Sequence, residues 1–173
     1  MGVKDIITQN MNKTDKILNI GCGNSRMSEE MYEDGYENIT NIDFSSKVIN
    51  QMDERTKAKC PKMVFRTMDV MDMKDLSSSE FMTVLDKGTL DSVLCGDNAV
   101  PMAAKMMSEI YRVLAPGGHY ICISFGDPEH RKKFIETQPW ESIHVDKIVK
   151  PSSSNGDDGD VKNYHYVYTV KKQ

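Results

Sequence analysis

Two glycines and an aspartate carry the most recognisable chemistry in this sequence. One apolar segment ends in Gly21-Cys22-Gly23, and a second ends in Asp43, twenty residues after Gly23. Glycine lets a ligand approach the backbone closely, and a carboxylate at the end of the next strand can accept hydrogen bonds from both hydroxyls of a ribose. The spacing therefore predicts a binding site for a nucleoside cofactor.

The glycine loop differs from the loops that bind phosphates. A dinucleotide-binding loop has a third small residue where this chain has Arg26, and the Gly-Lys-Ser/Thr sequence of a P-loop is absent. The chain also closes with two strands and no second mononucleotide-binding half. These differences argue against NAD and against a nucleoside triphosphate. A nucleoside cofactor without phosphates is compatible with the loop.

Short apolar segments alternate with amphipathic segments along most of the chain. Pro116-Gly117-Gly118 is expected to end the longest helix. Such alternation requires parallel strands joined by crossover helices, so it predicts an α/β sandwich. We expect strands at 16–20, 39–43, 63–67, 81–86 and 119–124, and helices at 26–34, 46–55, 98–114 and 128–137.

The C-terminal part breaks this alternation. Segments 143–149 and 164–171 are rich in β-branched and aromatic residues, and a polar loop, 151–162, separates them. Two strands without an intervening helix form an antiparallel hairpin, here attached to a parallel sheet. We therefore predict a single domain over residues 1–173, with a mobile hairpin loop at 151–162.

The composition argues against several other classes of protein. Of the 173 residues, 39% are hydrophobic and 28% are charged, and the net charge of −4 disfavours a nucleic-acid partner. No apolar run approaches the roughly 20 residues of a membrane span, and no secretion leader is recognisable. The four cysteines lie far apart, which argues against a zinc site and favours the reducing cytoplasm. We expect no metal and no membrane partner, and we favour a monomer.

In the order and spacing of its motifs, the chain resembles the class I S-adenosylmethionine-dependent methyltransferases. The glycine loop matches the loop over the cofactor's amino-acid moiety, Asp43 matches the ribose-binding acid, and Asp69-Val70 matches the adenine-binding pair. Leu114-Ala115-Pro116-Gly117-Gly118 is a further signature of the family. The resemblance implies a Rossmann-like, seven-stranded, mostly parallel sheet with an antiparallel last strand. It implies that S-adenosyl-L-methionine is the cofactor and S-adenosyl-L-homocysteine the product. The implied cofactor-binding residues are Gly21, Cys22, Gly23, Asn24, Asp43, Phe44, Asp69, Val70, Asp86 and Lys87.

The class of methyl acceptor is indicated by the residues at the end of the fourth predicted strand. The Asn/Asp-Pro-Pro-Tyr/Phe motif of many nucleobase methyltransferases is absent there. The hexapeptide Asp86-Lys87-Gly88-Thr89-Leu90-Asp91 instead resembles the signature of a methyltransferase-like group that includes lysine methyltransferases of elongation factor 1-alpha. The resemblance implies methylation of a lysine side chain in a protein. Two alternatives stay open: a small-molecule methyltransferase, and a module that binds the cofactor without activity.

The resemblance does not identify a catalytic residue. A lysine acceptor must lose its proton before an in-line displacement, and Asp86 and Asp91 are weak candidates for accepting that proton or orienting the amine. Asp91 is equally compatible with a role as a helix N-terminal acid. Relatives in the group usually carry a Tyr- and Trp-rich segment before the first strand, which covers the cofactor. Only about fifteen residues, none aromatic, precede that strand here, so we expect a short or truncated lid.

Overall fold

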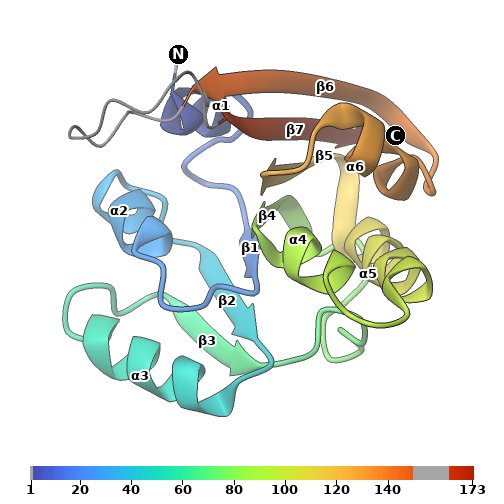
Figure 1. Ribbon diagram of the computed structural model, residues 1–173. Coiled ribbons are helices and arrows are strands. Elements are labelled where there is room, and N and C mark those ends of the chain that lie inside the picture. The colour runs from blue at the N-terminus through green and yellow to red at the C-terminus, as the bar shows by residue number, and fades with distance from the viewer. Residues whose placement is uncertain (1, 150–163) are drawn as a thin grey trace, which may run out of the picture.

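The computed structural model describes residues 2–149 and 164–173, and a seven-stranded sheet runs through its centre in the order β3-β2-β1-β4-β5-β7-β6 (Figure 1). The predicted loop at 151–162 lies outside the described residues. The strands are β1 (Ile17–Ile20), β2 (Ile39–Asp43), β3 (Val64–Thr67), β4 (Phe81–Lys87), β5 (Leu114–Ser124), β6 (Trp140–Val149) and β7 (Tyr164–Lys172). The helices are α1 (Val3–Gln9), α2 (Met27–Glu33), α3 (Ser46–Thr56), α4 (Thr89–Leu94), α5 (Ala99–Val113) and α6 (Pro128–Ile135).

The direction of the strands confirms the predicted topology. Strands β1 to β5 pair in parallel, whereas β7 runs antiparallel to both of its neighbours, β5 and β6. The strand order reverses at β1, which has β2 on one side and β4 on the other. In open α/β sheets, ligands bind beyond the carboxyl ends of the strands at such a switch point. The glycine loop follows β1 and therefore lies at this position.

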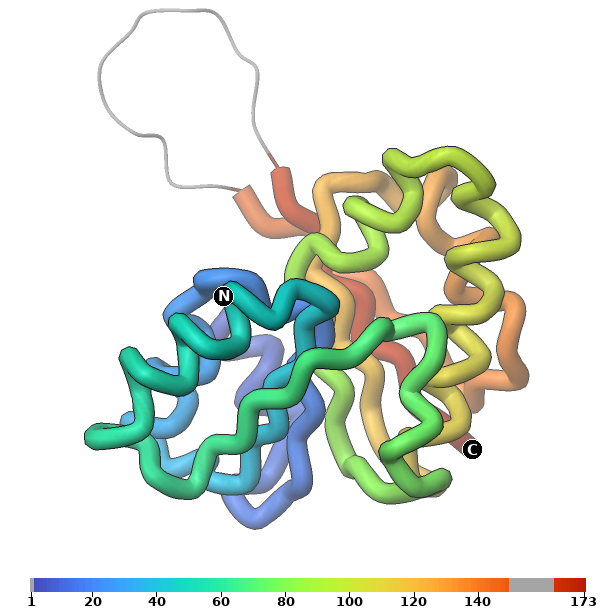
Figure 2. The backbone as a smooth tube through the Cα atoms, turned by 90° about the horizontal axis from the view of Figure 1, so that it is seen from below, coloured from blue at the N-terminus to red at the C-terminus, as the bar shows by residue number. Residues whose placement is uncertain are grey.

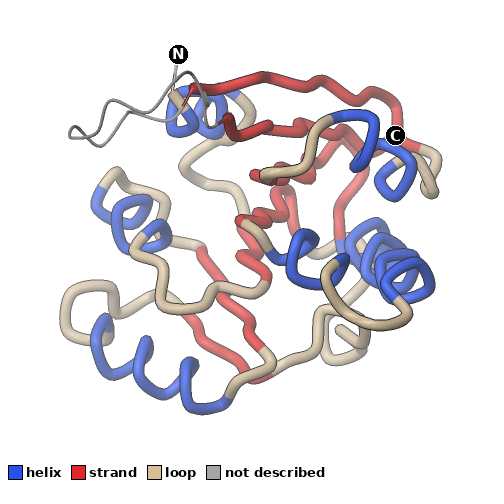
Figure 3. Tube along the Cα trace, viewed as in Figure 1, coloured by secondary structure: helices blue, strands red, loops and turns tan. Residues whose placement is uncertain are grey.

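Helices cover both faces of the sheet (Figure 3). Alternate residues of a strand point to opposite faces, so Leu18 and Ile20 pack with α4, α5 and α6, whereas Ile17 packs with α1 and α2. All three side chains are completely buried. Seen from below, the blue-to-teal N-terminal elements and the green-to-orange later elements lie on opposite sides of the molecule (Figure 2). The two layers of helices hold the carboxyl ends of β1 and β4 side by side.

Three local predictions need correction. The residues before β1 include a helix, α1, that was not predicted, and Ile6 and Ile7 of this helix are buried. The long helix, α5, ends at Val113, and the predicted Pro-Gly-Gly turn lies inside β5. Extended backbone already begins at Leu114, and a Cβ on Gly118 would lie 2.8 Å from the carbonyl oxygen of Met82 in the neighbouring strand. The glycine there allows two strands to approach each other.

Candidate active site

A cavity of about 430 Å³, here called pocket A, opens at the carboxyl ends of β1, β2 and β4. The loop after β3 contributes its fourth wall. Pocket A contains six of the residues predicted to bind the cofactor: Gly21, Asp43, Phe44, Asp69, Val70 and Lys87. Its other lining residues are Met68, Met71, Gly88, Thr89, Ser92, Val93 and Met102. Segments that follow β1, β2, β3 and β4 therefore meet around one cavity, together with Met102 of α5.

Two features of the structure require glycine at position 21. Its φ of +57° lies in the left-handed region, where a Cβ is strained. A Cβ at this position would also lie 2.2 Å from Oγ1 of Thr89, and this hydroxyl donates a hydrogen bond of 2.9 Å to the carbonyl oxygen of Ile20. Gly23 has a similar φ of +52°, but a Cβ there would have no atom within 4 Å. The loop thus packs tightly against α4 at Gly21 and leaves open space at Gly23.

The carboxylate of Asp43 connects the glycine loop to the start of α3. Its Oδ2 accepts a hydrogen bond of 3.0 Å from the backbone N–H of Gly23, and its Oδ1 accepts one of 3.0 Å from the N–H of Ser45. The hydroxyl of Ser45 in turn accepts from the N–H of Val48 and caps α3. A carboxylate can accept about four hydrogen bonds, so Asp43, which is 9% exposed, keeps acceptor capacity toward pocket A.

The rest of pocket A suits a flat, weakly polar group. Val70, Met71, Val93 and Met102 supply apolar walls, and Phe44 at the rim is 83% exposed. The backbone N–H of Met68 donates a 2.9 Å hydrogen bond to the carbonyl oxygen of Asp43, which holds the loop with Asp69 beside β2. This combination of two carboxylates, Asp43 and Asp69, glycine backbone at Gly21 and apolar walls fits the ribose and adenine of a nucleoside.

Four predicted cofactor residues lie outside the lining of pocket A. Cys22 is buried within the loop, and burial raises the pKa of its thiol to about 12, so the thiol stays protonated. Gly23 is connected to pocket A by the hydrogen bond from its backbone N–H to the carboxylate of Asp43. Asn24 is exposed, and its carbonyl oxygen accepts a hydrogen bond from Arg55.

Asp86 is the fourth of these residues, and it lies beneath the site as a completely buried carboxyl group. It accepts hydrogen bonds from the hydroxyl of Tyr120 at 2.8 Å and from the backbone N–H groups of Thr89, at 2.7 Å, and Leu90. Burial raises the pKa of Asp86 to about 6, although these donors favour the ionised form. The hydrogen bonds from Thr89 and Leu90 hold the first turn of α4 in place.

A second cavity of about 500 Å³, here called pocket B, adjoins pocket A. Lys87 and Gly88 line both cavities, so the turn after β4 separates them. Pocket B is bounded by α1, α2 and the ends of β5 and β7, with Ile7, Met27, Ile123, Phe125 and His165 in its lining. Glu30 of α2 and Asp34, which caps its C-terminal end, add carboxylates, and Lys4 pairs with Asp34 at 2.6 Å.

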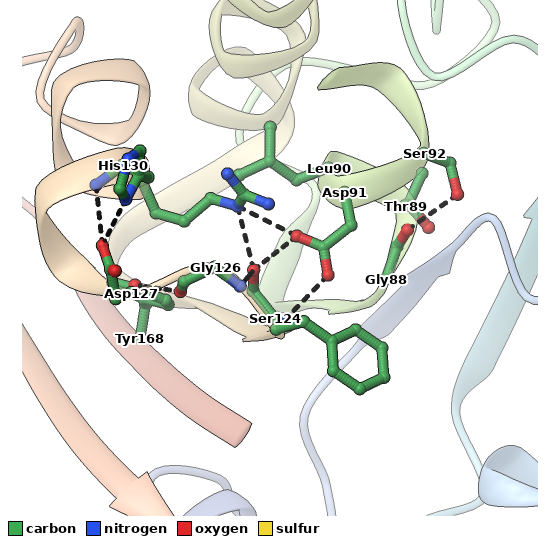
Figure 4. A network of polar contacts seen from close by, with 12 residues as sticks. Gly88, Thr89, Leu90, Asp91, Ser92, Ser124, Gly126, Asp127, His130 and Tyr168 are labelled. Carbon is green, nitrogen blue, oxygen red and sulfur yellow. Dashed lines mark hydrogen bonds and ion pairs between the residues drawn. The ribbon is translucent and has the colours of Figure 1, made fainter. Parts of the chain in front are cut away.

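Asp91, the other candidate for acid–base chemistry, lies in neither pocket lining. Its Oδ1 accepts from the hydroxyl of Ser124 and from Nε of Arg131, the latter at 2.9 Å, and its Oδ2 accepts from the N–H of Phe125 at 2.9 Å (Figure 4). The structure therefore places this carboxylate between α4, β5 and α6.

Sequence reasoning missed Phe125 and His165 as site residues. Phe125 follows β5 and His165 lies in β7, and their rings approach to 4.7 Å between centroids. Forty residues separate them in the sequence, and only the insertion of β7 beside β5 brings them together. The segment Ser124-Phe125-Gly126-Asp127-Pro128 was a usable signal, because it begins at the last residue of a predicted strand whose carboxyl end faces the site.

Comparison with known proteins agrees with this geometry. The family model described as a methyltransferase domain matches residues 11–168. The "eEF1A lysine and N-terminal methyltransferase" of Bos taurus is 43% identical over 123 residues, which are 70% of this chain and 18% of that protein. The "EEF1A lysine methyltransferase 4" of Mus musculus is 38% identical over 125 residues, 68% of this chain and 48% of that protein. The chain thus spans only a fraction of the length of these relatives.

Solved structures share the fold. A SAM-dependent methyltransferase from Methanosarcina mazei superposes with a TM-score of 0.72 at 19% identity, with 99% of each chain covered. A phosphoethanolamine N-methyltransferase from Haemonchus contortus, solved with S-adenosylhomocysteine, gives a TM-score of 0.72 at 16% identity over 98% of this chain and 52% of that chain. Together with the match to the family model, these findings show that the chain belongs to the methyltransferase-domain family and has the fold of the S-adenosylmethionine-dependent methyltransferases.

Proposed function

We propose that this domain transfers a methyl group from S-adenosylmethionine to a lysine side chain of a protein that resembles elongation factor 1-alpha. The observation that carries the proposal is the pair of adjoining cavities that share the turn at Lys87 and Gly88. One cavity has the chemistry of a nucleoside site, and the other has room for an acceptor on the far side of that turn. A group-transfer enzyme needs two such adjacent sites.

The residues of pocket A fit the cofactor. Asp43 would accept hydrogen bonds from the ribose hydroxyls, Val70 and Met102 would contact the adenine, and the backbone at Gly21 to Gly23 would lie under the amino-acid moiety. When bound, S-adenosylmethionine supplies an electrophilic methyl group on a positively charged sulfur. Phosphate-binding residues are not needed for such a cofactor, which agrees with Arg26 in place of a third small residue.

Pocket B has the properties that a lysine acceptor requires. An ammonium group must lose its proton before its nitrogen can attack, and transfer from water into an apolar cavity lowers the pKa of an amine. Ile7, Met27 and Ile123 supply that apolar surface. The carboxylate of Asp34 is already paired with Lys4, and Arg26 and Lys87 line the cavity together with Glu30, so charge alone does not attract the cation. The principal contribution of the protein is then to orient the amine and exclude water.

The choice of a protein lysine is supported by the relatives and by the hexapeptide at Asp86 to Asp91. Both relatives described above carry eEF1A lysine methylation in their names. We further infer a cytoplasmic protein that acts as a monomer, without a nucleic-acid or membrane partner. Within the described ranges, no helix is long and apolar enough to cross a membrane.

The test is methyl transfer from tritiated S-adenosylmethionine to purified elongation factor 1-alpha and to a cell lysate. Label on a lysine, located by mass spectrometry, supports the proposal. Label only in small soluble molecules would indicate a small-molecule methyltransferase. Binding of S-adenosylhomocysteine in calorimetry without any transfer would indicate a binding module, and heat from NAD alone would contradict the assignment of the cofactor.

A further inference from the structure

The carboxylate of Asp91 joins three elements that surround the exit of β5. It lies in the first turn of α4, and its side chain is 15% exposed. Besides accepting from Ser124 and Phe125, it forms an ion pair with Arg131 of α6, whose side chain is 17% exposed (Figure 4). Nε of Arg131 also donates a 3.0 Å bond to the hydroxyl of Ser124. A carboxylate with this set of donors is held in one position.

The same contacts fix the turn that follows β5. The N–H of Gly126 donates to the hydroxyl of Ser124 at 3.0 Å, and the carbonyl oxygen of Gly126 accepts from the hydroxyl of Tyr168 at 2.7 Å. A Cβ on Gly126 would lie 2.2 Å from Cζ of Arg131, so the guanidinium packs directly on this glycine. The turn at 124–126 is therefore bonded to α4, α6 and β7 at once.

The turn presents one large side chain to pocket B. Phe125 lines this cavity, and its ring lies against His165, although the residue is 61% exposed. Its backbone N–H is held by Asp91 at 2.9 Å. Ile7 of α1 also lines this cavity. The place of the aromatic ring in the pocket thus depends on a carboxylate that does not itself line the pocket.

We propose that Asp91 is a positioning residue for the acceptor: with Ser124 and Arg131, it fixes Phe125 as the wall of pocket B that contacts the acceptor side chain. The inference rests on the proposed function, since it takes pocket B as the acceptor site. Asp91 is badly placed to remove a proton from the acceptor, because its oxygens face Ser124, Phe125 and Arg131. Its effect on transfer is therefore indirect.

The experiment compares the whole chain with the variants Asp91→Asn, Arg131→Ala, Arg131→Lys and Phe125→Ala. Glu141→Gln is the matched control, because it removes an exposed ion pair with Lys171 at 2.9 Å on the β6–β7 hairpin. Three quantities are measured: hydrogen exchange of the Phe125 amide, calorimetric affinity for S-adenosylhomocysteine, and kcat and KM with purified elongation factor 1-alpha. Thermal melting identifies any variant that does not fold.

We expect Asp91→Asn to accelerate exchange of the Phe125 amide at least tenfold and to lower kcat/KM for the acceptor at least tenfold. The affinity for S-adenosylhomocysteine is expected to stay within about threefold of wild type, because pocket A is unchanged. Arg131→Lys should keep more activity than Arg131→Ala, since the ammonium can still pair with Asp91. Phe125→Ala should lower kcat/KM as Asp91→Asn does, while the control matches wild type.

The inference would be overturned by unchanged exchange at Phe125 in Asp91→Asn, or by faster exchange with unchanged kcat/KM. Equal losses in cofactor affinity and in kcat/KM would also contradict it, because they would indicate a general structural role. A failure of the proposed function is distinguishable, because the wild-type chain itself would then transfer no methyl group to the acceptor. In that case the proposed role of Asp91 in positioning an acceptor would be wrong as well.

Discussion

Asp43 combines two tasks in one carboxylate. It holds the glycine loop through the N–H of Gly23 and the start of α3 through the N–H of Ser45, both at 3.0 Å. Asp43 also lines pocket A. A ligand that bonds to Asp43 therefore meets an acceptor that is already oriented, which lowers the entropic cost of binding.

Replacing Asp43 by alanine should weaken binding of S-adenosylhomocysteine at least tenfold. Each lost hydrogen bond to a charged acceptor costs about 1.5–3 kcal/mol, and roughly 1.4 kcal/mol corresponds to tenfold in affinity. Isothermal titration calorimetry measures the change. Asp53→Ala, at an exposed position of α3, is the control and should bind as wild type does. Equal affinity of Asp43→Ala and wild type would exclude the ribose contact.

Gly21→Ala should destabilise the protein more than Gly23→Ala. Both residues have positive φ, for which alanine costs roughly 1–2 kcal/mol, but only at Gly21 would the new Cβ meet the side chain of Thr89. Urea unfolding without ligand measures the free energy of each variant. Adding Thr89→Ala should recover part of the loss in Gly21→Ala and none in Gly23→Ala. Equal destabilisation of the two glycine variants would contradict the close packing.

At the scale of elements, the junction between β4 and α4 borders both cavities. The buried carboxyl group of Asp86 bonds to the N–H groups of Thr89 and Leu90 and to the hydroxyl of Tyr120 in β5. Lys87 and Gly88 follow Asp86 in the chain and line both pockets. The protonation state of Asp86 therefore acts on the turn that separates pocket A from pocket B.

Asp86 should make stability depend on pH. Its folded-state pKa of about 6 lies above the ordinary value of 3.8. The stabilisation from binding a proton is thus fully present below about pH 4 and is lost as the pH rises through 6. Relative to Asp86→Asn, the unfolding free energy of wild type should fall over this interval by at most about 1.4 kcal/mol per pH unit. Urea unfolding between pH 4 and 8 measures the difference, and a difference independent of pH would contradict the raised pKa.

Elements with strong periodicity were predictable, and those defined by tertiary contacts were not. The parallel pairing of β1 to β5 and the antiparallel hairpin of β6 and β7 followed from the alternation of segments and the missing final helix, whereas the order of the strands in the sheet was not predicted. The short helix α1 was missed because Ile6 and Ile7 become buried only when the sheet is present. Asp43 was predicted as a binding residue because it ends the next strand after the glycine loop, twenty residues after Gly23. The contact of Phe125 with His165 depends on β7 lying beside β5, which no local pattern encodes.

At the scale of the whole molecule, ligand binding should stabilise both helical layers together. Pocket A is lined by residues that follow β1, β2, β3 and β4, so a bound nucleoside contacts segments from both sides of the switch point. Any ligand that binds only the folded state raises its free energy of unfolding.

S-adenosylhomocysteine at a hundred times its Kd should stabilise the fold by about 2.7 kcal/mol. For a domain of this size, that corresponds to a rise in Tm of roughly 5–10 °C. Differential scanning calorimetry measures it, with NAD at the same concentration as the matched control. A shift with NAD and none with S-adenosylhomocysteine would contradict the nucleoside assignment.

The position of β7 constrains the order in which the chain can fold during synthesis. This strand comes after β5 and β6 in the sequence but lies between them in the sheet, and it is hydrogen-bonded to both. While the ribosome still holds residues 164–172, β5 has an open edge, β6 has no partner, and Phe125 lacks the ring of His165. The part of pocket B that Phe125 and His165 line is therefore assembled late, after the strands around pocket A have emerged.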